Sequence, residues 1–226
     1  MNYPLYQNSG TTSHNRLLLA GMLVLLACAF RTVAPLPIQK ITAPATAAAI
    51  IPPPGNSVFL MGHAVGTQGY VCLPTSTGAS WTIYGSRPEA TLFSTTAGHD
   101  VQIISHFLSP DSSPNEFAPK PVPFGSATWQ SSVDSSKVWA QSLHSIAAGS
   151  DASCPNTGAI SCLLLQSTGS EAGPAGGKIM TGTSFIRRLN TQGGSARATG
   201  CPAATDVGKL ALVPYTADYH IFRADE

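Results

Sequence analysis

Apolar residues recur along most of the chain in short stretches, separated by segments rich in Gly, Pro, Ser and Thr. No window of helical length shows the i, i+3, i+4, i+7 stripe of an amphipathic helix. Short apolar stretches bounded by turn residues are typical of strands, so the pattern predicts an all-β fold, an antiparallel sandwich or a barrel-like single domain with long loops. The stretches expected to form strands are 58–65, 69–73, 81–84, 91–94, 101–108, 127–133, 137–143, 160–166, 178–189, 210–214 and 219–223.

Two hairpins are supported by their connections. In ATWQSSVDSSKVWAQ, the Asp-Ser-Ser segment 134–136 supplies turn residues between two apolar stretches. A second hairpin pairs 160–166 with 178–189 across a long Gly- and Ser-rich connection, of a length that is often functional or mobile. The segment 109–126 contains several prolines and cannot pair as a central strand, so it is an excursion or a lid over one end of the sheet.

The N-terminal region reads as a targeting segment. An uncharged apolar run, LLLAGMLVLLACAF, lies between Arg16 and Arg31. It is shorter than the roughly 20 residues that cross a bilayer, but it fits the apolar core of a secretion signal. We therefore expect a signal peptide over 1–29, an Ala-, Pro- and Thr-rich linker over 30–50 and a β-rich domain over 51–226.

Three fates of this segment are open. Cleavage after Ala29 would discard Cys28, whereas the LLAC sequence also resembles a lipobox, in which Cys28 would be lipidated and kept as an anchor. Leu26 stands where a lipobox usually has a small residue, so cleavage is favoured; an uncleaved anchor is the third alternative. The expected location is secreted, periplasmic or cell envelope.

The charge balance narrows the choice of partners. The chain has 12 basic and 11 acidic residues, and Arg16 is the only charged one before residue 30, so cleavage leaves 11 of each. A neutral chain without a basic stripe lacks the electrostatic footprint of a nucleic-acid binder. We expect no nucleic acid, and membrane contact only through the signal peptide or a lipid anchor.

Four cysteines remain after the signal, an even number in a chain expected to leave the cytosol. They allow three pairings. Cys154 and Cys162 enclose the turn-rich segment PNTGAIS, which favours a local bridge between them and therefore a bridge from Cys72 to Cys201. Free buried thiols are the alternative in a reducing compartment. No C-x-x-C spacing is present, so zinc is not expected.

Candidate catalytic residues are few. His99, Asp100 and His106 form the densest titratable cluster, and an imidazole beside a carboxylate suits general base catalysis. On one continuous strand, however, the separation of His99 from His106 places the two rings on opposite faces. No GxSxG, SxxK or metal-ligand spacing accompanies them, and we expect no metal and no cofactor.

Three further features have both a structural and a functional interpretation. The glycine-rich segment 62–69 is expected to be a turn or bulge, and TQGGSARATGC at 191–201 a tethered loop in which Arg197 could cradle an anion. Arg187 and Arg188 are expected on opposite faces of a strand, one of them partly buried and paired with an acidic residue, Asp218 or Glu89. Aromatic residues could line a ligand groove or fill the core: Trp81, Trp129, Trp139, Tyr70, Tyr84, Tyr215 and Tyr219.

A series of motifs resembles a known family. GHAVGTQGYVC, then PEATLF, a His-Phe pair at 106–107, ATWQSSVDSSKVWA, LLL, FIRRLNTQGG and VPYTADYHIF follow one another over roughly 51–223. In this order they resemble the domain of unknown function 3455 family of secreted bacterial and fungal proteins. Cys162 stands where relatives have a tryptophan, which supports a bridge to Cys154 particular to this chain.

The resemblance implies an exported β-rich fold with no assigned activity and no catalytic residues to carry over. Some fungal relatives bear the label malate dehydrogenase, but this sequence lacks the strand–helix alternation and glycine fingerprint of a nicotinamide-binding fold. The leading hypothesis is a non-enzymatic envelope or secreted binding or structural module for a small molecule, glycan or surface protein. The alternative is a secreted hydrolase that uses His99, Asp100 and His106 in a loop-covered pocket.

Overall fold

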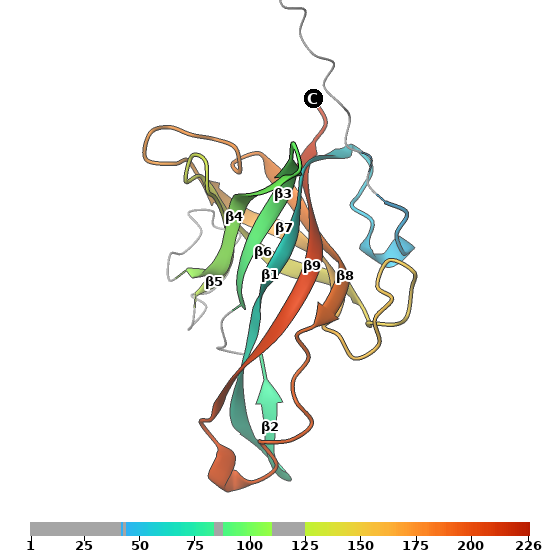
Figure 1. The fold of residues 1–226 in the computed structure, drawn as a ribbon, viewed down its shortest axis with the longest axis vertical. Coiled ribbons are helices and arrows are strands. Elements are labelled where there is room, and N and C mark those ends of the chain that lie inside the picture. The colour runs from blue at the N-terminus through green and yellow to red at the C-terminus, as the bar shows by residue number, and fades with distance from the viewer. Residues whose placement is uncertain (1–41, 43, 84–87, 110–124) are drawn as a thin grey trace, which may run out of the picture. The chain divides into compact units, whose positions relative to one another are not determined.

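The computed structural model describes residues 42, 44–83, 88–109 and 125–226, all within one compact unit, Gln39–Glu226. The described residues form strands and two short 3-10 turns, and none of them is α-helical (Figure 1). The all-β prediction is confirmed. The elements are η1 (Ala48–Ile50), β1 (Asn56–Thr75), β2 (Gly78–Thr82), β3 (Pro88–Thr96), β4 (His99–Ser109), β5 (Ser126–Ser131), β6 (Lys137–Ile146), β7 (Cys162–Glu171), β8 (Thr183–Gly193), η2 (Ala204–Asp206) and β9 (Leu210–Ala224).

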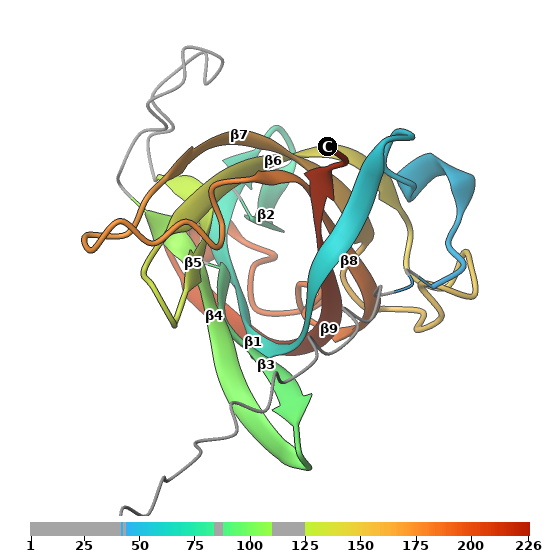
Figure 2. The same cartoon turned by 90° about the horizontal axis from the view of Figure 1, so that it is seen from above.

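The strands form one antiparallel sheet that closes on itself. Their order is β2-β1-β3-β4-β5-β6-β7-β8-β9, and β9 returns to pair with β1. The view from above shows the resulting ring (Figure 2). The ring is uneven, because β1 and β9 pair from Asn56 and Ala224 to Val71 and Leu210, whereas β5 and β6 pair only over 128–130 and 137–139. Of the two expected architectures, the structure has the barrel-like one.

β1 and β9 are longer than the sequence predicts. The glycine-rich segment 62–69 was expected to break the first strand, but β1 runs through it without interruption. Gly66 shows why a glycine is needed there: a Cβ at this position would overlap the main chain of Glu89 and Ala90 on β3. The glycine allows close approach of a neighbouring strand rather than a turn.

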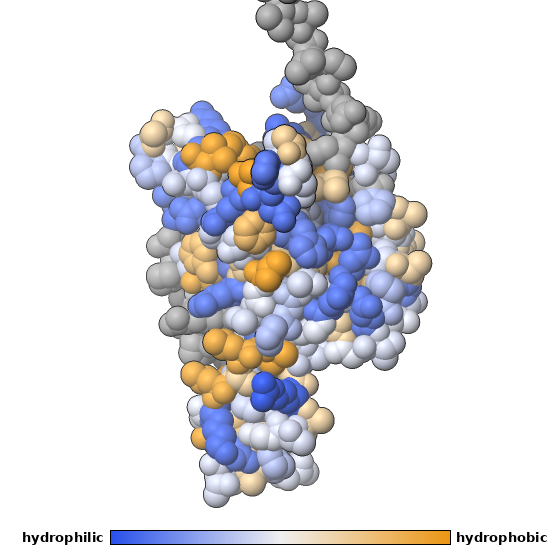
Figure 3. All heavy atoms as spheres, viewed as in Figure 1, coloured by the Kyte–Doolittle hydropathy of each residue, from blue (hydrophilic) through white to orange (hydrophobic). Residues whose placement is uncertain are grey.

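Beyond the ring, β1 and β9 continue together as an arm that also carries β2 (Figure 1). The Cys72–Cys201 disulfide ties this arm to the loop that precedes β9, with Cα atoms 5.7 Å apart. Figure 3 shows the surface of the ring and arm as separate apolar patches among polar atoms. The exposed apolar side chains of the arm include Leu210 and Leu212.

Alternate residues of the strands fill the interior of the ring. Leu92, Ile104, Trp129, Ile186 and Tyr219 are among the side chains that pack there, all with 1% exposure or less. Burial of such large side chains contributes about 1.5–3 kcal/mol each, which makes the interior the main source of stability. The side-chain alternation of a strand explains why these positions recur at every second residue.

A second cluster covers the outer face of β7, β8 and β9. The Cys154–Cys162 disulfide, whose Cα atoms are 5.9 Å apart, lies within it. Ile50 of η1 is fully buried there, so the packed chain begins inside the range 30–50 that the sequence predicts as a linker. Because both faces of β8 are covered, every side chain from Phe185 to Leu189 is buried. The cluster comprises Ile50, Val58, Cys154, Cys162, Leu164, Phe185, Leu189 and Phe222.

Both predicted hairpins are present, and they are joined through Asp134. Its Oδ1 accepts hydrogen bonds from the amide and hydroxyl of Ser136, at 3.1 and 2.7 Å, and its Oδ2 accepts one from the amide of Ile179 at 2.9 Å. The Gly- and Ser-rich connection between β7 and β8 is therefore anchored to the turn between β5 and β6.

Several expectations concern segments outside the described residues. The predicted signal peptide, its expected cleavage site and Cys28 all lie within 1–41, and most of the proline-rich segment lies within 110–124. In the part of the chain that the structure describes, no helix is long and apolar enough to cross a membrane.

Candidate functional site

The ring opens at the end where β1 and β9 leave it, and a cavity of about 390 Å³ lies in this opening. We call it the mouth cavity. Its walls come from β1, β6, β7 and β8, and two loop segments, 159–161 and 195–196, complete it. Its lining side chains include Gln68, Tyr70, Ser142, Leu163 and Arg188.

Arg188 is the only charged side chain that lines the mouth cavity in the described structure. It is 9% exposed, and its Nε and Nη2 donate to the main-chain oxygen of Ser161 at 3.3 and 2.8 Å. β8 places it inward, on the same face as Ile186, and Ser161 immediately precedes β7. The guanidinium is therefore held in one orientation by main chain rather than by an acidic side chain.

Tyr70 of β1 also lines the mouth cavity. It is 6% exposed and its hydroxyl donates to the main-chain oxygen of Gly194 at 2.6 Å. Burial raises the pKa of Tyr70, and the main chain of Ala196 and the charge of Arg188 act in the other direction. The loop after β8 is thus fixed across the ring opening through Tyr70.

This loop belongs to the segment 191–201, in which the sequence suggested Arg197 as an anion ligand. Arg197 is exposed and lines a separate surface hollow beside Trp81. The arginine that faces the mouth cavity is Arg188. The sequence predicts Arg187 and Arg188 on opposite faces of a strand, and this is confirmed. It also predicts one of them as partly buried and paired with Asp218 or Glu89; instead both are buried, because β8 is covered on both faces, and in the described structure neither pairs with these two residues.

Behind the mouth cavity the interior contains a polar and aromatic cluster. Tyr215 and Tyr219 are buried with their hydroxyl oxygens 3.3 Å apart, and burial raises the pKa of Tyr215. His106 stacks on Trp129, and its Nδ1 donates to the main-chain oxygen of Thr128 at 2.8 Å. The pKa of His106 is lowered to about 4, mainly by burial and also by the charge of Arg188, while the hydrogen bond to Thr128 acts in the opposite direction. The neutral imidazole is a core residue.

The structure does not bring His99, Asp100 and His106 together. His99 and Asp100 are exposed at the end of the β3–β4 hairpin, where Asp100 Oδ1 accepts a hydrogen bond from the hydroxyl of Thr95 at 2.8 Å. His106 lies inside the ring, against Trp129. The hydrolase alternative built on these three residues therefore has no common site in the geometry.

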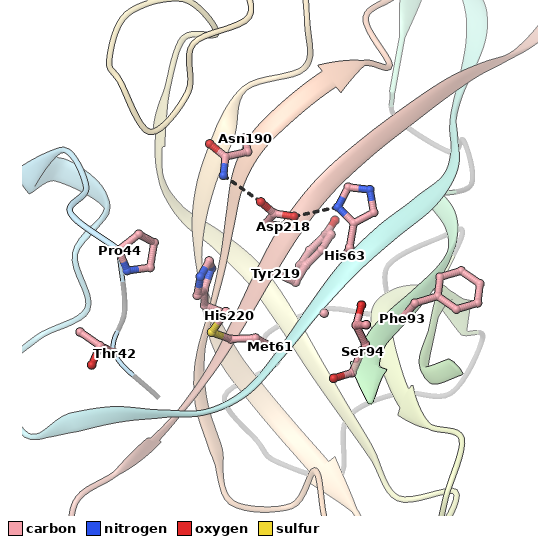
Figure 4. A pocket seen from close by; sticks show the side chains of 12 residues that line it. Thr42, Pro44, Met61, His63, Phe93, Ser94, Asn190, Asp218, Tyr219 and His220 are labelled. Carbon is pink, nitrogen blue, oxygen red and sulfur yellow. Dashed lines mark hydrogen bonds and ion pairs between the residues drawn. The ribbon is translucent and has the colours of Figure 1, made fainter. Parts of the chain in front are cut away.

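A histidine that the sequence did not single out lies on the outer face of the ring. His63 Nδ1 is 2.8 Å from Asp218 Oδ1, and Asn190 Nδ2 donates to Asp218 Oδ2 at 2.8 Å (Figure 4). Because Asp218 accepts, Nδ1 of His63 carries the proton and Nε2 is bare in the neutral ring. His63 and Asp218 are cross-strand partners on β1 and β9, which no sequence spacing reveals.

These residues line an open groove of about 480 Å³. We call it the outer groove; Met61, Phe93, Ser94, Thr42 and Pro44 also line it (Figure 4). Asn190 has a positive φ of 50° and lies where the β8–β9 register shifts between Leu189 and Gln192. Such a bulge re-aims a side chain, here the amide of Asn190 toward Asp218.

The second arginine, Arg187, is buried beneath the outer face of the sheet. Its guanidinium carbon lies 5.1 Å from the centre of the Phe222 ring, and it is 2% exposed. Burial lowers the pKa of Arg187 to about 10. His220, its cross-strand partner, has its pKa lowered to about 4 by burial and by the charge of Arg187, with Asp218 opposing.

The cysteines and the aromatic residues are the remaining candidates from the sequence. Both cysteine pairs are those that the sequence favoured. Trp129, Trp139, Tyr70, Tyr215 and Tyr219 are buried, Trp81 is half-buried and Tyr84 lies outside the described residues. Among the described residues no group of three or more His, Cys, Asp or Glu side chains is placed to hold a metal ion.

The fold and its cavities define the class of protein: a closed antiparallel ring of strands with two disulfides and a polar cavity at its mouth. Residues 53–223 match the family described as "Protein of unknown function (DUF3455)", and the chain belongs to this family. No curated protein and no solved structure matches the chain. The family resemblance inferred from the sequence is confirmed. The described strands of the ring do not alternate with helices, as the strands of a nicotinamide-binding fold do.

Proposed function

We propose that the chain is an exported, non-enzymatic binding module of the secreted or cell-envelope type, which holds a small ligand in the mouth cavity. The mouth cavity is the single observation that carries the proposal. It is open, its volume falls in the range of small-molecule sites, and the mouths of β-rings are a recurrent place for them. Tyr70 and Arg188 on its wall are fixed by main-chain partners, so the site is preformed.

Export is supported by two independent features. The apolar run 17–30 fits a secretion signal, and two disulfides are typical of oxidising compartments. Intact mass spectrometry of the unreduced protein recovered from outside the cytosol tests this part. We expect a chain that begins at Phe30 and lacks four hydrogens relative to its reduced form. A chain that retains residues 1–29 and free thiols would overturn export.

Ligand binding is tested by titrating the folded protein with a mixed set of small organic fragments and following its ¹⁵N–¹H spectrum. Shifts are expected to gather on the residues of the mouth cavity, and A196W, which fills the rim, should abolish them. V133W, at the exposed β5–β6 turn, is the matched control and should leave them unchanged. Shifts confined to the outer groove, or equal effects of the two variants, would contradict the proposal.

One observation favours a second candidate, a hydrolase. The His63–Asp218–Asn190 array resembles the oriented imidazole of a general base, with its bare Nε2 in an open groove. Hydrolysis of an activated ester such as p-nitrophenyl acetate tests it. Activity that H63Q and D218N remove and A196W leaves intact would replace the binding module by this candidate; activity unaffected by H63Q would dismiss it.

A further inference from the structure

Arg188 carries a charge that the described part of the chain does not balance. The acidic side chains that contact cations elsewhere, such as Glu171 with Lys137, lie away from the mouth cavity. The hydrogen bonds of Arg188 go to one neutral acceptor, the main-chain oxygen of Ser161. Its charge reaches well into the interior, since it lowers the pKa of His106, Tyr70 and Tyr215 relative to what burial alone would give.

A buried, unpaired cation is an expensive feature to retain. A guanidinium stays protonated in proteins, so it cannot escape the cost of burial by losing its proton as a lysine can. Removing a charge from water without a counter-charge is unfavourable, whereas burying an apolar side chain of the same volume is favourable. The position would be filled more cheaply by Met or Leu if its role were packing alone.

The N–H groups of Arg188 that make no hydrogen bond to the described residues indicate which class of ligand the cavity could bind. Ser161 takes the edge of the guanidinium formed by Nε and Nη2. The terminal edge formed by Nη1 and Nη2 retains donors that make no hydrogen bond to the described residues. Parallel N–H groups of this edge match the two oxygens of a carboxylate or a phosphate. Since Arg188 lines the mouth cavity, this edge is accessible from it.

We propose that the mouth cavity binds a small organic anion, whose carboxylate or phosphate group takes the terminal Nη1–Nη2 edge of Arg188. This inference rests on the proposed function and names its ligand class. The non-ionic part of the ligand packs on Leu163 and Ile160 in the wall, and the hydroxyls of Ser142 and Ser145 at the rim supply further polar contacts. Within the described cavity wall no carboxylate opposes an anion.

Isothermal titration with three probes that share a phenyl ring tests the inference: benzoate, its neutral isostere benzamide, and phenyl phosphate. Anions are expected to bind at least about tenfold more tightly than benzamide, because a charge-assisted bidentate pair is stronger than a neutral contact. Tighter binding of benzoate assigns a carboxylate, and tighter binding of phenyl phosphate a phosphate. If benzamide binds as well as both anions at the mouth cavity, the anion class is overturned while the binding module stands; if none of the three binds, the inference also fails.

Variants of Arg188 separate a ligand-binding arginine from a structural one. R188M should abolish the preference for anions and unfold at the same or a higher temperature than the parent in anion-free buffer, because it removes an unpaired buried charge. R188K keeps the positive charge but loses the paired, parallel N–H donors of the guanidinium, and should weaken anion binding about tenfold or more. R197M, at an exposed arginine, should change neither property. Unfolding of R188M at a clearly lower temperature, together with normal anion binding by R188K, would overturn the inference.

Discussion

The imidazole of His106 lies flat on the indole of Trp129, with the ring centroids 4.0 Å apart and the planes inclined by 10°. Both side chains are inside the ring, and the only polar contact of His106 among the described residues is the main-chain oxygen of Thr128. A histidine in this setting is stable only while it is neutral, because its protonated form would be a second buried cation near Arg188. The stacking relationship therefore predicts how stability depends on pH.

We expect the protein to lose stability as the pH falls from about 6.5 toward 4. The pKa of His106 is lowered from 6.5 to about 4 in the folded state, so the unfolded chain binds more protons in this window. The contribution of His106 is complete above pH 6.5, and about 3 kcal/mol is lost by pH 4, as follows from about 1.4 kcal/mol per pKa unit. Urea unfolding at a series of pH values measures it; His220 has a lowered pKa of the same sign and adds to the slope.

H106Q isolates the share of His106. Glutamine keeps a donor for Thr128 but does not titrate, so the free energy of unfolding should fall less steeply between pH 6.5 and 4, although it starts lower at pH 7 because the stacking is lost. H144Q, at an exposed histidine, is the matched control and should keep the parent slope. An unchanged slope in H106Q would mean that His106 is protonated without cost.

The two disulfides are expected to contribute unequally. Cys72 and Cys201 are 129 residues apart and Cys154 and Cys162 only 8. Because a bridge restricts the unfolded chain more when it closes a longer loop, the double variant C72A/C201A should lose about 5 kcal/mol and C154A/C162A about 2.5 kcal/mol. Chemical unfolding of each variant against the oxidised parent measures both losses. The reverse order would show that packing of the buried local bridge outweighs chain entropy.

Much of the fold is readable from the sequence because alternation and turn chemistry are local. The strands at 101–108 and 137–143 and the turn at Asp134 needed only neighbouring residues to be recognised. The ends of strands were harder to predict. Gly66 and Pro214 are residue types that often end a strand, yet β1 and β9 run through both positions. Pairing of these two long strands overrides the local preference, and nothing local shows that Gly66 is required by β3.

The sites were less accessible to sequence reasoning, because their residues come from distant strands. His63 and Asp218 are 155 residues apart and meet only through the β1–β9 register. Arg188 was recognised as a strand cation, but its burial depends on both faces of β8 being covered. The one signal available in the sequence was polar residues in the middle of apolar strands, as in MGHAV and TADYHIF.

The connection between β7 and β8 is expected to depend on Gly173. A Cβ there would overlap the main-chain oxygen of Asp134, which is fixed by the turn and cannot yield as a flexible side chain would. G173A should therefore lower the free energy of unfolding by about 1–3 kcal/mol, the usual cost of overpacking. G182A, in the same connection but with open space around the added methyl, should change it by less than about 0.5 kcal/mol. Equal effects in thermal unfolding would show that the connection adjusts freely.

Asn190 is expected to stabilise the outer groove through its side chain despite its backbone conformation. N190A should cost about 1–2 kcal/mol, since it removes the hydrogen bond to Asp218 and places alanine at φ 50°, where asparagine is better tolerated. N190G should recover the backbone part of this loss only. Ser135, with a φ of 60° in the β5–β6 turn, is the matched control: S135A against S135G isolates the backbone term. If N190G is as stable as the parent, the side-chain amide of Asn190 contributes nothing to stability. The ¹⁵N spectrum of the His63 imidazole, which reports the proton on Nδ1, should in that case also be unchanged.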